Sequence, residues 1–142
     1  MLNTIGMAAE NFCTHQMGIP NVKKGKTPDT QMFITYIDIN INNQKNYRVY
    51  IMPNKDFIQN VAEIFLEEEQ SDTETLQDMA LETANLIVGS AKVIAQKNKH
   101  NVTIQTPHFE KIGTFDAFYD ERETFFINTQ KSLTLAIKEL NV

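Results

Sequence analysis

Residues 32–52 read MFITYIDINI-NNQKN-YRVYIM, and this stretch decides the fold. Its first ten residues alternate between two sides, one of them more apolar, and are rich in β-branched and aromatic side chains, as in a half-buried strand. Asn42-Asn43 is suited to a turn because asparagine tolerates positive φ. A second alternating run follows, with Tyr47, Val49 and Ile51 on one side. The stretch therefore predicts a β-hairpin.

Helical spacing flanks this hairpin on both sides. Before it, apolar residues recur at loosely helical intervals over 2–17, and the run ends at Gly18-Ile19-Pro20. After it, a helix is expected over 57–65, ending in an acidic, solvated run at 67–69. The longest helical pattern follows from Thr73 to about Lys97, with Ser71 and Glu74 spaced as a capping box at its start.

The rest of the chain predicts further strands joined by polar segments. The basic, polar residues 21–30 are expected to form a loop, and residues 108–122 contain no motif that assigns them a role. Strands are expected at 102–104 and 115–119, and a terminal hairpin is expected from the apolar runs 125–127 and 133–137. Helices grouped apart from runs of adjacent strands indicate an α+β fold, with helices packed on a mostly antiparallel sheet. We expect one domain over residues 1–142.

Composition narrows the class of function. The 142 residues include 13 Lys+Arg and 18 Asp+Glu, for a formal charge of −5 and a pI near 5.1. Affinity for nucleic acid comes mainly from Lys and Arg that neutralise phosphates, so this balance argues against nucleic acid and against an anionic membrane surface. The chain has no long apolar run and no leader-like start, so we expect a cytoplasmic protein that does not engage a membrane.

Most catalytic motifs are missing. The five glycines never cluster into a phosphate loop, and the three histidines lack metal-ligand spacing, so no metal site is expected. Cys13 has no arginine placed a few residues later to hold a phosphate, and is expected to be a buried, inert thiol.

One segment of the long helix differs from the rest. Asp78, Glu82, Asn85 and Gly89 are spaced three or four residues apart, so a helix places them on one stripe. A glycine inside a helix costs about 1 kcal/mol relative to alanine, and here it lies on the polar stripe. A bare position beside a carboxylate and a carboxamide would let the backbone of another protein come close. The same pattern is also typical of an ordinary solvated helix face, and the residues alone leave both interpretations open.

The segment Glu82-x-x-Asn85-Leu-Ile-Val-Gly89-Ser-Ala-Lys92 resembles the signature helix of the CheX/CheC/FliY family of chemotaxis phosphatases. The resemblance extends over the whole chain, through the first helix, the Lys-Gly-Lys segment before the hairpin and the terminal hairpin. CheC-like members carry two such sites on pseudo-symmetric helices. The first helix here offers Asn3 and Gly6 without a glutamate three residues earlier, so the resemblance implies one site, as in the CheX branch.

This resemblance implies a phosphatase that hydrolyses the phosphoaspartate of a CheY-like response regulator. Asn85 would orient the attacking water, and Glu82 would pair with a lysine of the receiver domain. Asp78, Gly89 and Lys92 are then candidate contacts with the partner. The resemblance implies no cofactor in this chain, with Mg²⁺ held by the receiver, and it implies a homodimer. Two alternatives stay open: a non-catalytic module that docks a receiver or a flagellar-switch partner, and a structural subunit whose polar stripe only faces solvent.

Overall fold

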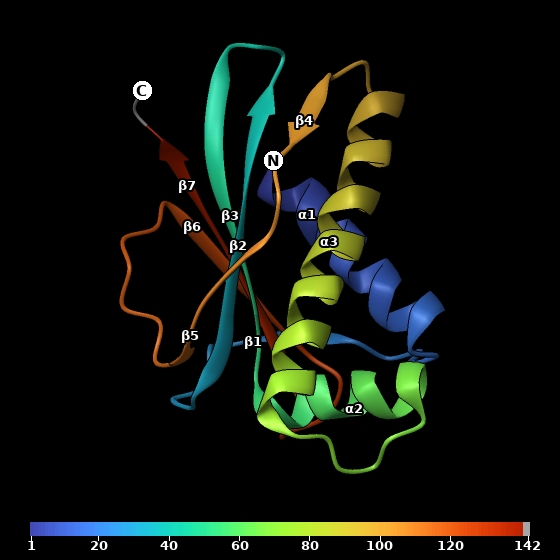
Figure 1. Cartoon of the computed structure of the whole chain (residues 1–142). Helices are drawn as coiled ribbons and strands as arrows, with labels where there is room; N and C mark the ends of the chain where they lie inside the picture. Colours follow the sequence, from blue (N-terminus) through green and yellow to red (C-terminus); the bar gives the residue numbers. More distant parts are fainter. Residues whose placement is uncertain (141–142) are drawn as a thin grey trace.

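The fold is an open antiparallel sheet with helices on one face, seen in a computed structural model that describes residues 1–140 (Figure 1). The strand order is β1-β6-β7-β3-β2-β4, with β5 also paired to β2, and every described pairing is antiparallel. The predicted α+β class is confirmed. The strands are β1 Lys23–Gly25, β2 Met32–Ile41, β3 Lys45–Pro53, β4 Val102–Ile104, β5 His108–Gly113, β6 Glu121–Phe126 and β7 Ser132–Leu140.

The predicted hairpin forms the middle of the sheet. Strands β2 and β3 pair from Thr35 opposite Ile51 to Ile41 opposite Lys45. The turn between them holds Asn42 at φ 55° and Asn43 at φ 56°, the left-handed region that asparagine tolerates better than most residues. The apolar side of the alternation is buried beneath the helices, as the pattern predicted.

Three helices cover one face of this sheet (Figure 1). Helix α1 spans Leu2–Asn11 and continues as a π-helical turn, η1, at Phe12–Gln16; α2 spans Lys55–Leu66 and α3 spans Thr73–Lys97. Gly18, at φ 73°, follows the first helix and ends it as predicted. The main core consists of the inner side chains of the sheet and the buried stripes of all three helices.

A second, smaller core lies on the outer face of the sheet. It is formed by outward side chains of β2, β3 and β7, and the segment 114–120 packs over them. The ring centroids of Phe115 and Tyr50 are 4.8 Å apart. The prediction of a strand at 115–119 is therefore wrong, because these aromatic side chains cover the sheet face and their backbone does not join the ladder.

Three other local predictions are corrected. Lys23–Gly25 forms a short strand on β6 inside the expected loop, and His108–Gly113 pairs with β2 inside the unassigned segment. Both strands are largely exposed, so they lack the alternation that would have predicted them. The N-cap of α3 is Asp72, which accepts a hydrogen bond from the Thr75 amide at 2.8 Å, so the expected capping box from Ser71 is wrong.

Within residues 1–140, no helix combines the length and apolar character needed to cross a membrane.

Candidate functional site on helix α3

Helix α3 presents one face to the core and the opposite face to solvent. Its buried residues form one broad stripe, whose members are Leu76, Met79, Ala80, Thr83, Ala84, Ile87, Val88, Ala91 and Ala95. Asp78, Glu82 and Asn85 lie on the opposite side and are exposed, and Gly89 and Lys92 on the same side are half-exposed. The structure thus brings the five predicted site residues onto one stripe, which we call the α3 ridge.

Gly89 leaves a position without a side chain on the α3 ridge, between Asn85 and Lys92. A Cβ atom built on Gly89 would meet nothing within 4 Å, apart from its neighbours and its own helix. Packing inside this chain therefore gives no reason for a glycine at this position, although alanine would favour the helix by about 1 kcal/mol. The open position is suited to the close approach of another molecule.

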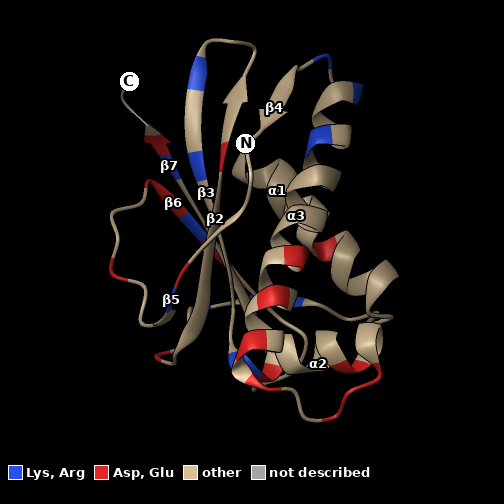
Figure 2. Ribbon diagram, viewed as in Figure 1, with Lys and Arg blue, Asp and Glu red and all other residues tan. Residues whose placement is uncertain are grey.

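The polar side chains of the α3 ridge have no partners among residues 1–140. Within residues 1–140, no ion pair involves Asp78, Glu82 or Lys92, and the Asn85 carboxamide makes no hydrogen bond. Acidic residues gather on the first half of α3 and around the end of α2, whereas the last turns of α3 carry lysines (Figure 2). A partner that meets the Asp78 end of the ridge would therefore encounter mainly negative charge.

The chain offers little else for conventional catalysis. Among residues 1–140, no group of three or more His, Cys, Asp or Glu side chains is arranged to hold a metal ion. Cys13 is buried in η1, and its pKa is raised to about 12 by burial and by the charge of Glu10. The prediction that this thiol is buried is confirmed, and its protonated state makes it a poor nucleophile.

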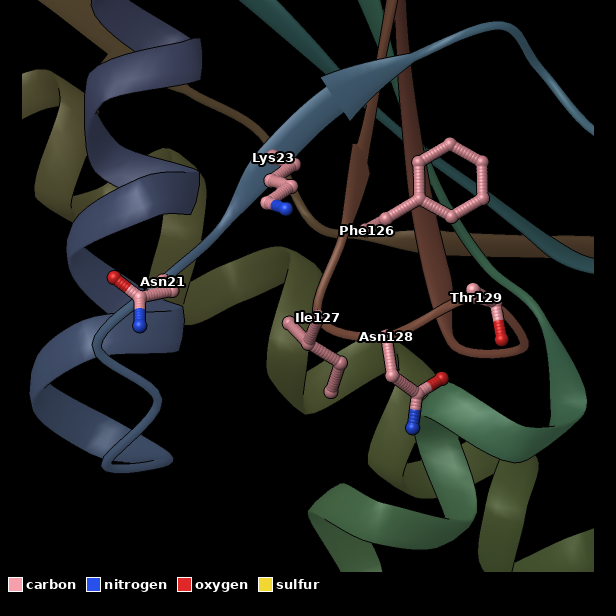
Figure 3. Close-up of a pocket in the computed structure, with 6 residues that line it drawn as sticks. All are labelled: Asn21, Lys23, Phe126, Ile127, Asn128 and Thr129. Carbon is pink, nitrogen blue, oxygen red and sulfur yellow. The ribbon is translucent and has the colours of Figure 1, made fainter.

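Two hollows, of about 570 and 560 Å³, lie away from α3. One of about 570 Å³ is open between β1 and the β6–β7 turn, and Figure 3 shows the six side chains that line it. Among the described residues that line it, Lys23 is the only charged one, and no acidic side chain lies beside it to form an acid–base pair. The lining residues are Asn21, Lys23, Phe126, Ile127, Asn128 and Thr129.

A smaller hollow, which we call the α1–α3 groove, borders the α3 ridge. It measures about 290 Å³ and includes Leu86, the residue next to Asn85. Sequence reasoning did not single out this groove, because its two sides come from segments about seventy residues apart that show no common motif. The lining residues are Ala8, Asn11, Phe12, His15, Gln16, Leu86 and Ser90.

Comparison with solved structures finds the same fold in chemotaxis proteins. The chain resembles the chemotaxis protein CheX from Vibrio vulnificus at a TM-score of 0.81 and 16% identity, covering 97% of this chain and 95% of that chain. It resembles the CheX in a CheX–CheY–BeF3–Mg²⁺ complex from Borrelia burgdorferi at a TM-score of 0.72 and 16% identity, with coverage of 99% and 97%. A CheC-like protein from Shewanella oneidensis gives a TM-score of 0.74 at 12% identity, with coverage of 97% and 96%.

At these sequence identities, the similarity establishes a common fold and does not assign a role to any individual residue. No protein with a curated description matches the chain. A family model described as chemotaxis phosphatase CheX matches residues 36–129, which is more than half of the sequence and includes the α3 ridge. The chain belongs to the CheX family of chemotaxis phosphatases.

Proposed function

We propose that this chain hydrolyses the phosphoaspartate of a CheY-like receiver domain, using Asn85 on the α3 ridge. Membership of the CheX family supports a phosphatase or receiver-binding role. A protein of the same fold has been crystallised with CheY, BeF3 and Mg²⁺, which supports a receiver as the partner. The single observation that carries the proposal is the exposed, unpaired Glu82 and Asn85 beside the open position of Gly89.

Asn85 has the chemistry that this reaction needs. Hydrolysis of an acyl phosphate requires a water in line with the leaving carboxylate, and positioning that water supplies much of the catalysis. A carboxamide both donates and accepts hydrogen bonds, so it orients a water without changing its own protonation state. This form of catalysis does not require Asp78 or Glu82 of the α3 ridge to act as a general acid or base.

Glu82 would set the position of the partner. It lies one turn before Asn85 on the same side of α3, and its carboxylate is exposed and unpaired. A charge-assisted bond from a receiver lysine to this carboxylate would place Asn85 at the phosphoryl group. Asp78, Gly89 and Lys92 would contact the receiver along the same ridge, and Gly89 would admit its backbone.

Magnesium, in this proposal, is held by the receiver and neutralises charge on the transferred phosphoryl group. Glu82 then needs only to bind the receiver, and Asn85 needs only to orient the attacking water. Addition of EDTA is therefore expected to stop phosphate release without changing the circular dichroism spectrum of this chain.

The test is phosphate release from a phosphorylated, Mg²⁺-bound CheY-like receiver, measured with wild type, Asn85→Ala and Gln96→Ala. Gln96 is an exposed carboxamide three turns further along α3, so its removal is a matched control. Wild type and Gln96→Ala are expected to accelerate release, whereas Asn85→Ala is expected to leave the receiver at its own rate. An Asn85→Ala variant with the wild-type rate would contradict the proposal.

The same experiment distinguishes a non-catalytic docking module from an enzyme. A module of that kind would bind the receiver and leave its rate of dephosphorylation unchanged. If Glu82→Ala and Asn85→Ala alter neither binding nor turnover, the α3 ridge is an ordinary solvated surface.

Family membership also leads us to propose a homodimer. The sheet ends at exposed edges, and an edge strand offers unpaired backbone groups to another chain. Light scattering at micromolar concentration would then give twice the chain mass of 16.3 kDa.

A further inference from the structure

Exposed apolar side chains gather on one side of the α3 ridge. Leu86 and Val93 are 37% and 51% exposed, and they are seven residues apart, so they lie on one line along α3. That line runs beside Asn85 and Gly89 on the side that faces α1. Met7, on α1, is 54% exposed.

The α1–α3 groove lies between the two helices that carry these side chains. Leu86 lines it from α3, and Asn11 lines it from the end of α1. Met7 is four residues before Asn11 and therefore lies on the same side of α1. Leu86 directly follows Asn85 in the chain, so the groove adjoins the α3 ridge.

The surface area that must be buried in a specific complex indicates how far the contact with the receiver extends beyond the α3 ridge. A standard interface buries about 800 Å² on each partner, and its centre is more apolar than its rim. The polar side chains of the α3 ridge alone form a surface too narrow to bury this area. That surface is also too charged to supply the apolar centre. A receiver that admits Asn85 must therefore also cover one flank of α3.

The two flanks of α3 offer different chemistry. On one flank the connection between β4 and β5 runs beside the helix (Figure 1), and it exposes Gln105 and Thr106. On the other flank lies the α1–α3 groove, which is lined by no Asp, Glu, Lys or Arg residue. An acidic ridge beside a groove that includes the apolar side chains of Ala8, Phe12 and Leu86 complements a partner surface that carries a basic side chain next to apolar ones.

We propose that the docking surface for the CheY-like receiver extends from the α3 ridge across Leu86 and Val93 onto the α1–α3 groove and Met7. This inference rests on the proposed function and adds the side from which the receiver binds. The occupant is an apolar segment of the receiver that adjoins the lysine proposed to pair with Glu82.

The test is titration calorimetry with a Mg²⁺-bound, beryllofluoride-activated CheY-like receiver. Met7→Glu and Val93→Glu place a charge on the proposed surface without changing a buried residue, and each is expected to raise the Kd at least tenfold. Phe118→Glu is the matched control, because Phe118 is 70% exposed in the segment that covers the opposite face of the sheet. It is expected to bind with the wild-type Kd, and circular dichroism verifies that all three variants fold.

Three outcomes would overturn the inference. Wild-type Kd values for both Met7→Glu and Val93→Glu, together with wild-type phosphatase activity, would overturn the extended surface and leave the proposed function standing. A dimer that Met7→Glu converts to a monomer in light scattering would assign the groove to a second copy of the chain. A wild-type protein that neither binds nor dephosphorylates any CheY-like receiver of the same cell would remove the proposed function, and this inference with it.

Discussion

Helices α1 and α3 lie on the same face of the sheet, and each contains a glycine, but the two glycines have opposite surroundings. A Cβ on Gly6 would come within 3.0 Å of the Glu123 carboxylate and 3.5 Å of the Phe125 ring. A Cβ on Gly89 would meet no atom within 4 Å outside its own helix backbone and its chain neighbours. Gly6 thus permits close packing of α1 on β6, whereas Gly89 leaves α3 open to solvent.

This difference bears on whether α1 carries a second site of the kind expected from the resemblance to CheC-like proteins. On α1 the glycine is buried against the sheet, whereas Asn3 is exposed. On α3 the carboxylate, the carboxamide and the glycine all lie on the solvent side. The same residue type therefore marks packing in one helix and, in our proposal, recognition in the other.

Thiol reactivity should show the largest contrast between the two helices. Cys13 lies in η1, the turn that follows α1, and its thiol is buried. Burial raises its pKa from a usual value of 9.0 to about 12, which lowers the thiolate fraction at pH 8 roughly 1000-fold. Iodoacetamide is therefore expected to modify native Cys13 about three orders of magnitude more slowly than the urea-unfolded chain. In a Cys13→Ala background, Gly89→Cys is expected to react at the rate of an ordinary exposed thiol. Equal rates for the two native proteins would break the comparison.

Substitution of leucine for each glycine should lower the free energy of unfolding in α1 but not in α3. Gly6→Leu inserts a side chain against Glu123 and Phe125, and overpacking of this kind costs about 1–3 kcal/mol. Gly89→Leu adds helix propensity at an open position, so its free energy of unfolding is expected to be equal to the wild type or higher by up to about 1 kcal/mol. Urea denaturation measures both values. A destabilised Gly89→Leu would mean that Gly89, too, is required for packing.

Receiver binding, unlike stability, should be affected strongly by a substitution at Gly89. Gly89→Leu is expected to raise the Kd for the activated receiver at least tenfold, because the added side chain would hold the partner's backbone away from the α3 ridge. Gly89→Ala is expected to have a smaller effect, since a single methyl group is added. Titration calorimetry measures both constants, and a Gly89→Leu protein that binds like wild type would show that the partner does not approach Gly89.

The smallest expected effect is the pH dependence of the α3 N-cap. Hydrogen bonds from the Thr75 hydroxyl and amide lower the pKa of Asp72. A lowered carboxyl pKa stabilises the fold above the unfolded pKa of about 3.9, and this stabilisation is lost as the pH falls through the folded value. The stability difference between wild type and Asp72→Ala should therefore be present at pH 7 and shrink below about pH 4.

Asn54 provides the neutral control for this titration. It caps α2 by accepting a hydrogen bond from the Phe57 amide at 2.9 Å, and it also donates to the Gln130 carbonyl at 2.7 Å. A carboxamide does not titrate, so the effect of Asn54→Ala should be constant over the same pH range. If the Asp72→Ala difference is equally constant, the ionised carboxylate is not what stabilises the cap.

The sequence predicted the elements that bury one face. The alternation of residues 32–52 predicted β2 and β3, and the helical spacing over 73–97 predicted α3, because burial imposes a period on apolar residues. β1 and β5 are short and largely exposed, so burial imposes no period on them. The aromatic residues of 115–119 resemble a strand in composition and instead cover the outer sheet face.

The candidate site was predictable only in part. Spacing along one helix was enough to place Glu82, Asn85 and Gly89 on one stripe. The space around Gly89 depends on the absence of neighbouring elements, and the α1–α3 groove depends on two distant segments meeting. Neither property leaves a pattern in the local sequence.

The position of β3 has a consequence for how the chain folds. β3 lies between β2, which precedes it by a short turn, and β7, which follows it by about eighty residues. The hairpin can form early, but its β3 edge stays unpaired until β7 has been synthesised and the intervening helices have packed. Pairings of such high sequence separation slow folding, and an open edge strand is prone to pair with other chains in the meantime. Nascent chains that end before β7 should therefore depend on chaperones more than full-length chains do.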